Sequence, residues 1–383
     1  MGYRRIPCTF MRGGTSKALV FRRADLPADE SIWPDIFRLA MGSPDPYGRQ
    51  LDGMGGGVSS LSKVCVVGPS TRPDADIDYS FYQIGIKDDL VDVRGNCGNM
   101  SSAMGPFALD EGFVKAGSTG TATVRIHNTN TSKIIRAQFP VEDGTAKVDG
   151  PQEIDGVAGR GAPIRLEFLD PGGAGTGKLL PADGEAVSEL EVAGIGRVAV
   201  SMVDAANPCV LVDARTLGKF GTELPDALEA DEDCLAVLET IRRRASVAMG
   251  IAASEEDAAR IPAVPKVAML ASPAPHVSLS GREIGSTDHD IIVRMISMGT
   301  PHRAVPLTGA LCLAVAVRTP GTLANMLAGD GAATIRIAHP SGILEVDAKV
   351  VDNDGVPTAV HGAVYRTARR LFEGNVLVPD AQL

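Results

Sequence analysis

Cys97 lies in a short run of glycine and asparagine, and this setting suits it to acid–base chemistry. The run Asn96-Cys-Gly-Asn99 opens into an apolar stretch that predicts a buried helix over residues 98–111. A helix N-terminus presents unpaired backbone N–H groups and a positive partial charge, so it binds anions and favours a thiolate. We therefore predict that Cys97 gives or takes a proton beside a bound anion, which Asn96, Gly98 and Asn99 contact. The alternative is a helix cap with a purely structural role.

Two lysines stand at the start of strands that should be buried. Lys63 opens the run Lys63-Val-Cys-Val-Val-Gly-Pro69, and Lys266 opens the similar run Lys266-Val-Ala-Met-Leu-Ala271. Lysine is rarely buried without a reason, because removing its charge from water is costly. Snorkelling of the side chain and ion pairing are structural reasons. We favour the functional one, in which both lysines face a ligand cleft.

Further loops carry hydrogen-bond donors for an anionic ligand. An arginine fork beside exposed backbone amides suits a carboxylate, and serine hydroxyls precede the first lysine. A histidine and an arginine precede the second predicted helix. Ordinary surface turns are the alternative for each loop, and a lone histidine is usually structural. The predicted ligand contacts in these loops are Arg12, Gly13, Gly14, Thr15, Ser16, Ser59, Ser60, Lys266, His302, Arg303, Thr308 and Gly309.

The segments that carry these residues recur in the same order in both halves of the chain. Such ordered internal similarity predicts a duplicated domain, with residues 1–185 as the N-terminal half and 186–383 as the C-terminal half. The two helix N-termini are then expected to hold two carboxylates of one ligand, only one of them beside a thiol. The matched segments are 15–26 with 207–217, 62–69 with 265–273, 77–84 with 289–296, and 95–103 with 305–310.

The secondary-structure pattern predicts an α+β fold. Short β-branched runs bounded by Gly, Pro and Asp predict strands, as at 121–126, 134–139 and 334–338. Each half then has one apolar helix, over 98–111 and 307–317, which should be buried. Amphipathic helices are expected over 226–248 and 254–260. We expect each half to be a mostly antiparallel, barrel-like sheet around its central helix.

Composition and charge exclude several classes of function. The chain has 383 residues, 44% of them hydrophobic, and a net charge of −10. An acidic balance argues against nucleic acid and anionic membrane surfaces as partners, because both favour an excess of Lys and Arg. The apolar runs are far shorter than the ~20 residues that span a bilayer, and residues 1–8 lack the apolar region of a signal peptide. We expect a cytoplasmic protein that binds a small molecule. The sequence leaves open whether it is a homodimer.

The six cysteines give no sign of a metal site. They lie at positions 8, 65, 97, 209, 234 and 312, without Cys-x-x-Cys spacing and without clustered histidines. Thiols so spaced are expected to be reduced, and Cys65, Cys234 and Cys312 are expected to be small buried side chains. The glycine-rich stretch 171–177 lacks the following Gly-Lys-Ser/Thr of a phosphate loop, so we predict a surface turn. Neither a metal nor a cofactor is predicted.

Four ordered motifs resemble those of the 2-methylaconitate isomerase family, which includes 4-oxalomesaconate tautomerase and methylitaconate Δ-isomerase. They are Phe10-Met-Arg-Gly-Gly-Thr-Ser-Lys17, Gly55-Gly-Gly-Val-Ser-Ser-Leu-Ser-Lys63, Gly95-Asn-Cys-Gly-Asn99, and Gly299-Thr-Pro-His-Arg-Ala304 with Leu307-Thr-Gly-Ala310. The resemblance implies the diaminopimelate epimerase-like fold, with two pseudo-symmetric halves and the active site between them. It also implies that Lys63 and Cys97 move a proton on an unsaturated di- or tricarboxylate without a cofactor.

The reaction expected from this resemblance is a 1,3-allylic proton shift. One group removes a proton from a carbon activated by a carboxylate and a C=C bond, helix-terminal amides stabilise the dienolate, and another group returns a proton at the far carbon. We favour Lys63 as base and Cys97 as acid, although the sequence does not fix the direction. A racemase or epimerase of the diaminopimelate type is the alternative, but Pro306 and Leu307 occupy the place of its second cysteine. A non-catalytic carboxylate-binding protein would not need both Lys63 and Cys97.

Overall fold

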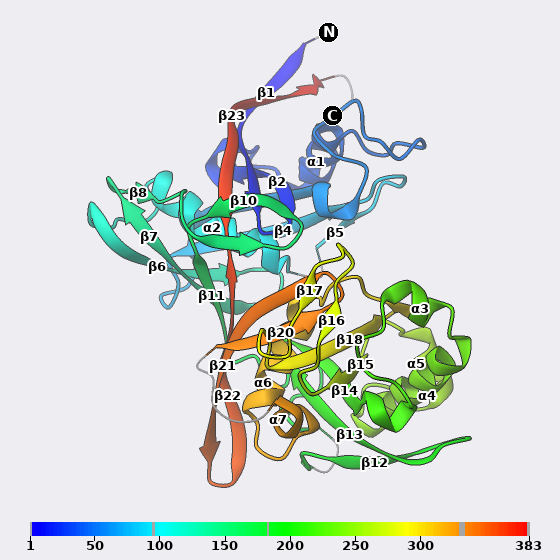
Figure 1. Cartoon of the computed structure of the whole chain (residues 1–383). Helices are drawn as coiled ribbons and strands as arrows, with labels where there is room; N and C mark the ends of the chain where they lie inside the picture. The colour runs from blue at the N-terminus through cyan, green and yellow to red at the C-terminus, as the bar shows by residue number, and fades with distance from the viewer. Residues whose placement is uncertain (1, 94–95, 182–183, 329–333, 381–383) are drawn as a thin grey trace. The chain divides into compact units, whose positions relative to one another are not determined.

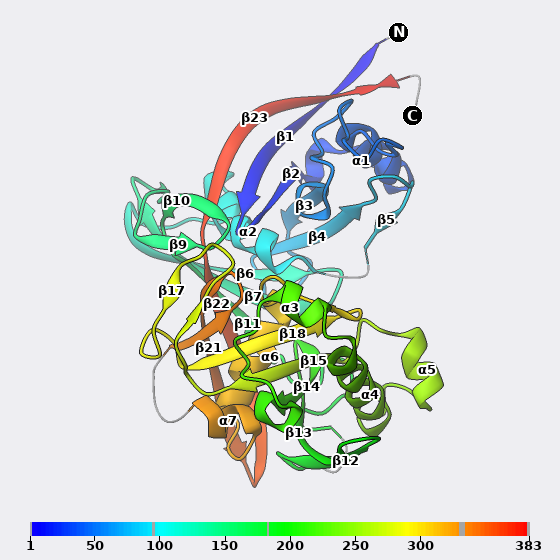
Figure 2. The same cartoon turned by 45° about the vertical axis from the view of Figure 1, so that its right-hand side comes forward.

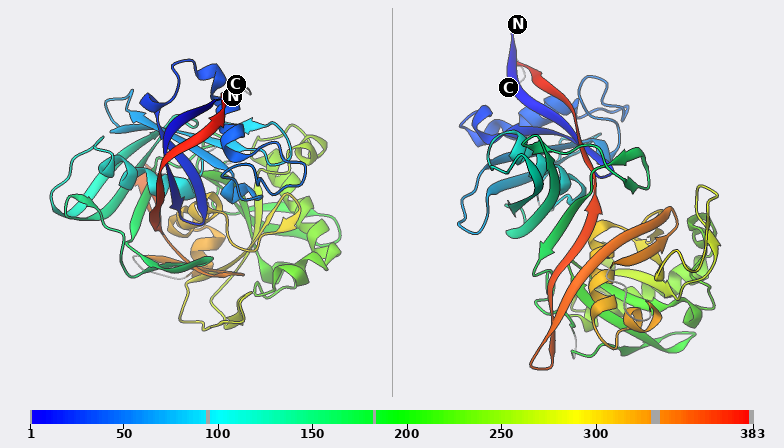
Figure 3. Two further views of the ribbon diagram at one scale, coloured as in Figure 1. Left: turned by 90° about the horizontal axis from the view of Figure 1, so that it is seen from above. Right: turned by 60° about the vertical axis from the view of Figure 1, so that its left-hand side comes forward.

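The computed structural model describes residues 2–93, 96–181, 184–328 and 334–380. Gly95, which opens one of the four motifs, lies outside the described residues. The chain forms two compact units, one of residues 1–167 with 365–383 and the other of residues 168–364. The last strand, β23 (Ala368–Pro379), pairs antiparallel with the first, β1 (Tyr3–Gly13), and the two lie side by side in both views of Figure 3. The C-terminal end of the chain therefore completes the sheet of unit 1.

Unit 1 is built on one series of strands. From β1 the pairing runs antiparallel to β2, parallel to β3, antiparallel to β4, parallel to β6 and antiparallel to β7. The expected strands at 121–126 and 134–139 lie within β6 and β7. The bounds are β2 (Ser16–Arg22), β3 (Lys63–Pro69), β4 (Ile77–Ile84), β5 (Val91–Asp92), β6 (Thr119–Asn128), β7 (Lys133–Glu142), β8 (Thr145–Ala146), β9 (Gln152–Ile154), β10 (Val157–Gly161) and β11 (Ile164–Leu169).

Two helices pack on opposite faces of this sheet, as Figure 2 shows. α1 (Trp33–Met41) packs on β2 and β3 through a core that includes Leu19, Val64 and Val66. Because side chains alternate along a strand, the neighbouring Lys63 and Cys65 face the other way. That other face carries α2 (Gly98–Asp110), whose residues from 100 to 109 are all buried. The buried helix predicted over 98–111 is confirmed.

Unit 2 is also built on a series of strands. β12 pairs antiparallel with β13, and from β13 the pairing runs antiparallel to β14, parallel to β15, antiparallel to β18, parallel to β20 and antiparallel to β21, which pairs antiparallel with β22. The bounds are β12 (Ser188–Val192), β13 (Gly196–Ala205), β14 (Asn207–Asp213), β15 (Lys266–Ala271), β16 (His276–Val277), β17 (Glu283–Ile284), β18 (Ile291–Ser297), β19 (Thr300–Pro301), β20 (Ile335–His339), β21 (Gly342–Asn353) and β22 (Val356–Arg366).

Helices cover both faces of this second series, with α4 (Glu232–Ala248) and α6 (Leu307–Arg318) on opposite sides of β14 and β15 (Figure 1). The helix predicted over 307–317 is confirmed as α6, and the one predicted over 254–260 is α5 (Glu255–Arg260). The remaining helices are α3 (Pro225–Glu229) and α7 (Leu323–Ala328). Among the described helices, none combines the length and the apolar character needed to cross a membrane.

The single helix predicted over 226–248 is wrong, because this stretch is divided into α3 and α4. Asp231 leaves the helical conformation, with φ −98° and ψ 73°, and its carboxylate accepts the backbone N–H of Cys234 at 3.0 Å. An aspartate that caps the next turn ends one helix and begins another. The amphipathic spacing on both sides of Asp231 concealed this interruption.

The fold is mixed α and β, but the barrel-like sheet expected for each half is not closed. In unit 1, the described strand pairs run from β23 through β1 to β7, β7 also pairs with β8 and β11, and no pair joins β7 to β23. The helix α2 packs along one face of this open sheet, where it contacts β1, β2, β3, β6, β7, β8 and β23. The stretch 171–177 forms a turn, in which Asp204 accepts the backbone N–H groups of Gly175 and Thr176 at 2.8 and 2.6 Å.

Candidate active site

Cys97 is the cap residue that begins α2. Its backbone is extended, with φ −102° and ψ 97°, and its carbonyl accepts the N–H of Ser101 at 2.9 Å. Its thiol makes no capping hydrogen bond to the helix and lies 4.0 Å from the Ser16 hydroxyl. The side chain is half-buried, whereas the other five cysteines are buried, and none of the six forms a disulfide. The burial predicted for Cys65, Cys234 and Cys312 is confirmed.

The turn between β1 and β2 packs directly on the start of α2. Asn99 donates its side-chain N–H to the Thr15 hydroxyl at 3.1 Å. Gly14 has φ +51°, and a Cβ there would lie 2.3 Å from Asn99 Oδ1. At Gly13 a Cβ would lie 2.6 Å from the Asn99 carbonyl. Only glycine allows this approach, so the turn between β1 and β2 lies in direct contact with Asn99.

Lys63 is the first residue of β3 and is 8% exposed. Its ammonium donates to the side-chain oxygen of Gln83 and lies 5.0 Å from the centre of the Phe81 ring. No carboxylate pairs with Lys63 in the described part of the chain. Ion pairing is therefore not the reason for its burial, and its nitrogen contacts a neutral amide and a ring face instead.

Gln83 lies beside Lys63, and the sequence analysis did not single it out. Its side-chain N–H groups donate to the carbonyls of Ser59 and Ser62 at 3.0 and 2.9 Å, which leaves its oxygen for Lys63. The amide therefore fixes the lysine head group relative to the 3₁₀ turn Ser59–Leu61. The signal was available in principle, because antiparallel pairing of β3 with β4 places Gln83 opposite Lys63.

Cys65 lies beside both predicted catalytic residues, and Tyr79 lies beside Cys65 and Cys97. Burial raises the pKa of the Cys65 thiol, the charge of Cys97 raises it further, and the charge of Lys63 lowers it. Burial also raises the pKa of Tyr79, with Cys65 and Cys97 adding to the effect. Both groups therefore stay protonated and neutral. Lys63 and Cys97 both act on Cys65, which places the two predicted proton carriers near one buried thiol on one face of the sheet.

The guanidinium of Arg12 donates hydrogen bonds to backbone carbonyls of unit 1. Its guanidinium donates to the Gly14 carbonyl at 2.9 Å, to the Thr367 carbonyl at 3.0 Å and to the Thr367 hydroxyl at 2.9 Å. Burial lowers its pKa, with a smaller effect from the charge of Arg369. These three bonds occupy much of the fork expected to bind a carboxylate. Asn96 likewise accepts the Ser101 hydroxyl at 3.2 Å.

Of the predicted ligand contacts of unit 2, His302 is the one that lies beside Lys266 among the described interactions. β14 pairs with β15 so that Cys209 is opposite Lys266, and the lysine donates to the Ala263 carbonyl at 3.5 Å. Burial lowers the pKa of Lys266, against an opposing effect of Cys209. The pKa of His302 is lowered by burial first and then by the charge of Lys266, so these two side chains are neighbours.

The remaining predicted contacts of unit 2 differ in exposure. Arg303 forms an exposed ion pair with Asp226 at 2.9 Å, a partner that the sequence did not indicate. Thr308 and Gly309 lie in the first turn of α6. A Cβ at Gly309 would lie 2.5 Å from the Met295 sulfur, so this glycine serves close packing.

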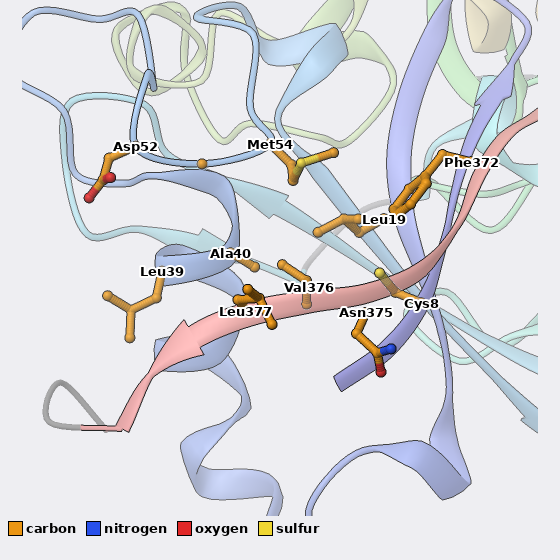
Figure 4. Close-up of a pocket in the computed structure, with 11 residues that line it drawn as sticks. Cys8, Leu19, Leu39, Ala40, Asp52, Met54, Phe372, Asn375, Val376 and Leu377 are labelled. Carbon is orange, nitrogen blue, oxygen red and sulfur yellow. The ribbon is translucent and has the colours of Figure 1, made fainter. Parts of the chain in front are cut away.

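A separate cavity of about 440 Å³ lies on the other face of the unit 1 sheet. Figure 4 shows its mostly apolar lining, which includes Cys8, Leu19, Met54, Phe372 and Val376. Leu19 belongs to the core that packs against α1, the face opposite Lys63. None of the predicted site residues lines this cavity, so it is separate from the candidate active site. Within the described residues, no group of three or more His, Cys, Asp and Glu is arranged to hold a metal ion.

Comparison with known proteins finds similarity over the whole chain. Residues 3–379 match the family described as PrpF protein. The chain is 44% identical over 383 residues to a 3-methylitaconate isomerase from Eubacterium barkeri, covering 99% of this chain and 98% of that protein. It is 41% identical over 388 residues to a 2-methyl-aconitate isomerase from Cupriavidus necator, covering 98% and 97%.

A solved structure agrees with these relatives. The crystal structure of a methylitaconate-delta-isomerase has a TM-score of 0.93 and 43% sequence identity to this chain, covering 100% of this chain and 97% of that one. Similarity of this extent applies to both units and to every segment that carries a predicted site residue.

Proposed function

Because the chain belongs to the PrpF family, it is an isomerase, and we propose that it moves a proton between allylic carbons of an unsaturated di- or tricarboxylate. Relatives named for methylitaconate and methylaconitate support this substrate class. The observation that carries the proposal is local. A buried lysine that pairs with no carboxylate among the described residues, and a helix-start thiol that makes no capping hydrogen bond, both lie beside Cys65.

Lys63 and Cys97 divide the proton transfer in this proposal. The unprotonated amine of Lys63 takes a proton from the carbon next to a substrate carboxylate, and the electron pair delocalises into a dienolate. The N–H groups at the start of α2 stabilise the oxyanion that develops. The Cys97 thiol then gives its proton to the far allylic carbon. Proton exchange with solvent returns lysine to the amine and cysteine to the thiol, so no atom or electron is gained or lost.

Gln83 serves as a positioning residue in this mechanism. Its oxygen accepts a hydrogen bond from the lysine nitrogen, and its own N–H groups are fixed on the carbonyls of Ser59 and Ser62. A neutral partner orients Lys63 without holding it in the charged form, as a carboxylate would. Such an arrangement suits a lysine that must lose a proton to act as a base.

We also propose that the two units are copies of one ancestral domain. The sequence of pairings from β1 to β7 matches that from β13 to β21 in direction at every step. A matched ion pair supports the same proposal. Arg125 donates to Asp76 through its backbone N–H at 2.8 Å and its guanidinium at 2.7 Å. Arg336 donates to Asp290 in the same way, through its backbone N–H and its guanidinium, each at 2.7 Å.

Hydrogen exchange at the substrate tests the proposed chemistry. In D₂O, the wild-type protein should place deuterium at the allylic carbons of a methylaconitate, aconitate, oxalomesaconate or methylitaconate substrate. Lys63→Ala and Cys97→Ala should each reduce this exchange at least ~1,000-fold, the upper range for one acid or base. Cys234→Ala, which removes a buried thiol of α4, serves as the matched control and should keep full exchange. Full turnover by Cys97→Ala would refute the mechanism.

A further inference from the structure

Arg366 ends β22 and is 7% exposed, yet no acidic side chain pairs with it in the described part of the chain. Its Nε–H donates to Asn99 Oδ1 at 3.2 Å, and Nη1 donates to the Tyr365 carbonyl at 2.8 Å. Nη2, which carries two N–H groups, has no hydrogen-bond partner among the described residues. The sequence analysis did not single out this arginine, because no motif surrounds it.

Other arginines show how unusual this arrangement is. Arg370, four residues later, is half-buried but contacts Glu111 and Glu373 at 2.8 Å each. Burial lowers the pKa of Arg294 to about 10, but the charge of Glu223 opposes that shift. For Arg366, burial alone lowers the pKa to about 10, so the side chain is a cation at neutral pH, and the described residues give it no counter-charge. A buried charge of this kind is costly unless something pairs with it.

The unpaired cation lies at the start of α2. Asn99 is the second residue of that helix, two positions after Cys97, and it contacts both Arg366 and the Thr15 hydroxyl. A Cβ at Gly14 would lie 3.2 Å from Arg366 Cδ, so the arginine also packs on the turn between β1 and β2. The positive end of a helix and an uncompensated guanidinium therefore meet at one place, and both attract an anion.

We propose that Arg366 binds one carboxylate of the substrate, beside the N–H groups at the start of α2, and so sets the preference of this site for dicarboxylates and tricarboxylates. The proposal rests on the proposed function. The planar fork of arginine matches a carboxylate with two parallel hydrogen bonds. Nη2 supplies the donors that the protein leaves unused. Asn99 holds the arginine through Nε, and the bound carboxylate supplies the missing counter-charge.

The test measures binding of itaconate, an unsaturated dicarboxylate, and of its two monomethyl esters by titration calorimetry. The variants are Arg366→Met, which keeps bulk and removes charge, and Arg366→Lys, which keeps charge and removes the fork. Arg369→Met removes an exposed arginine from the neighbouring strand and is the matched control. We expect Arg366→Met to weaken itaconate binding about 100-fold, Arg366→Lys about 10-fold, and Arg369→Met less than threefold.

The esters separate a binding role from a structural one. For the wild-type protein, masking the carboxylate that Arg366 binds should weaken binding about 100-fold, whereas masking the other should have a different effect. In Arg366→Met, masking that same carboxylate should cause no further loss, because its partner is already gone. A merely structural role would weaken all three ligands equally and preserve their ratios. Unchanged itaconate affinity in Arg366→Met, or preserved ratios, would overturn the proposal.

Two measurements distinguish failure of this proposal from misfolding of the variant and from failure of the proposed function. Removing an uncompensated buried charge should leave the melting temperature of Arg366→Met equal to that of the wild type or higher. If that variant fails to fold, the ratios measured for Arg366→Lys decide the question. If the wild-type protein exchanges no substrate protons with D₂O, the proposed function fails. If exchange occurs and Arg366→Met keeps its affinity, only the role of Arg366 fails.

Discussion

The start of α2 in unit 1 and the start of α6 in unit 2 have similar surroundings but different chemistry. Each helix is buried, and each unit also has a lysine that begins a strand, Lys63 on β3 and Lys266 on β15. The cap residue is Cys97 in the first unit and Pro306 in the second. Unit 1 therefore has a thiol beside its lysine at a helix start, whereas unit 2 has the lysine and the helix start without that thiol.

The thiols of unit 2 do not replace the missing one. Cys209 and Cys312 are both fully buried, and Cys312 donates to the Val203 carbonyl at 3.4 Å. Burial and a hydrogen bond with Cys209 raise the pKa of Cys312, so it stays a neutral thiol. A helix start and a lysine each favour binding of a carboxylate, whereas proton transfer also needs an accessible acid. We therefore expect chemistry in unit 1 and substrate binding in unit 2.

Replacing each lysine by methionine should separate these two roles. The loss of kcat in the Lys63 variant is the largest effect we expect. Lys63→Met should lower kcat at least ~1,000-fold, because it removes the base. Lys266→Met should raise KM about 10-fold and leave kcat within threefold, because it removes only a contact made equally in the ground and transition states. Steady-state kinetics on the substrate found by the exchange assay measures both. A large fall in kcat for Lys266→Met would contradict the division of roles.

Changing Gln83 should sharpen the same comparison with a smaller effect. Gln83→Leu removes the acceptor that orients Lys63, and we expect kcat to fall about 10- to 100-fold. Gln83→Glu keeps the geometry but adds a negative charge, which stabilises the protonated amine. Its activity at pH 7 should therefore fall, and the rising limb of the kcat–pH profile should move to higher pH. An unshifted profile in Gln83→Glu would show that Lys63 is not the base.

The control for Gln83 comes from a polar residue elsewhere in unit 1. Asn130 also bridges backbone, donating to the Phe81 carbonyl at 2.9 Å and accepting the Phe81 N–H at 2.8 Å. It makes no contact with Lys63. Asn130→Asp should therefore leave the position of the pH profile unchanged, even if it lowers stability.

The sequence predicted the strand and the helix that hold the proposed proton carriers, Lys63 and Cys97, because these features are local. The loop 96–99, the apolar helices and the strand-opening lysines are each visible within about ten residues. Gln83 and Arg366 contact partners on other elements, Lys63 on β3 and Asn99 on α2, and no local pattern marks them. Arg12 was predicted as a ligand contact from its residue type. Its bonds to Thr367 depend on how the C-terminal strand pairs with β1, which composition and spacing do not reveal.

The matched ion pairs Asp76–Arg125 and Asp290–Arg336 test the similarity between the two units rather than their difference. Breaking either pair should change the free energy of unfolding, and this is the smallest effect we expect. For both aspartates burial raises the pKa, but hydrogen bonds from the arginine outweigh it and the net pKa is lowered. A carboxylate with a lowered folded-state pKa stabilises the protein above its unfolded pKa, and that contribution is lost as the pH falls through the folded-state pKa. Asp76→Asn and Asp290→Asn should therefore each lower the free energy of unfolding by about 1 kcal/mol at pH 7. The difference from the wild type should shrink once the pH falls below 3.8, the ordinary value for aspartate. Urea titrations of both variants at pH 7 and at pH 3 measure this. The two variants should lose similar amounts of free energy of unfolding. A difference of more than about 1 kcal/mol between them would mean that the two ion pairs, despite their similar geometry, do not stabilise their units equally.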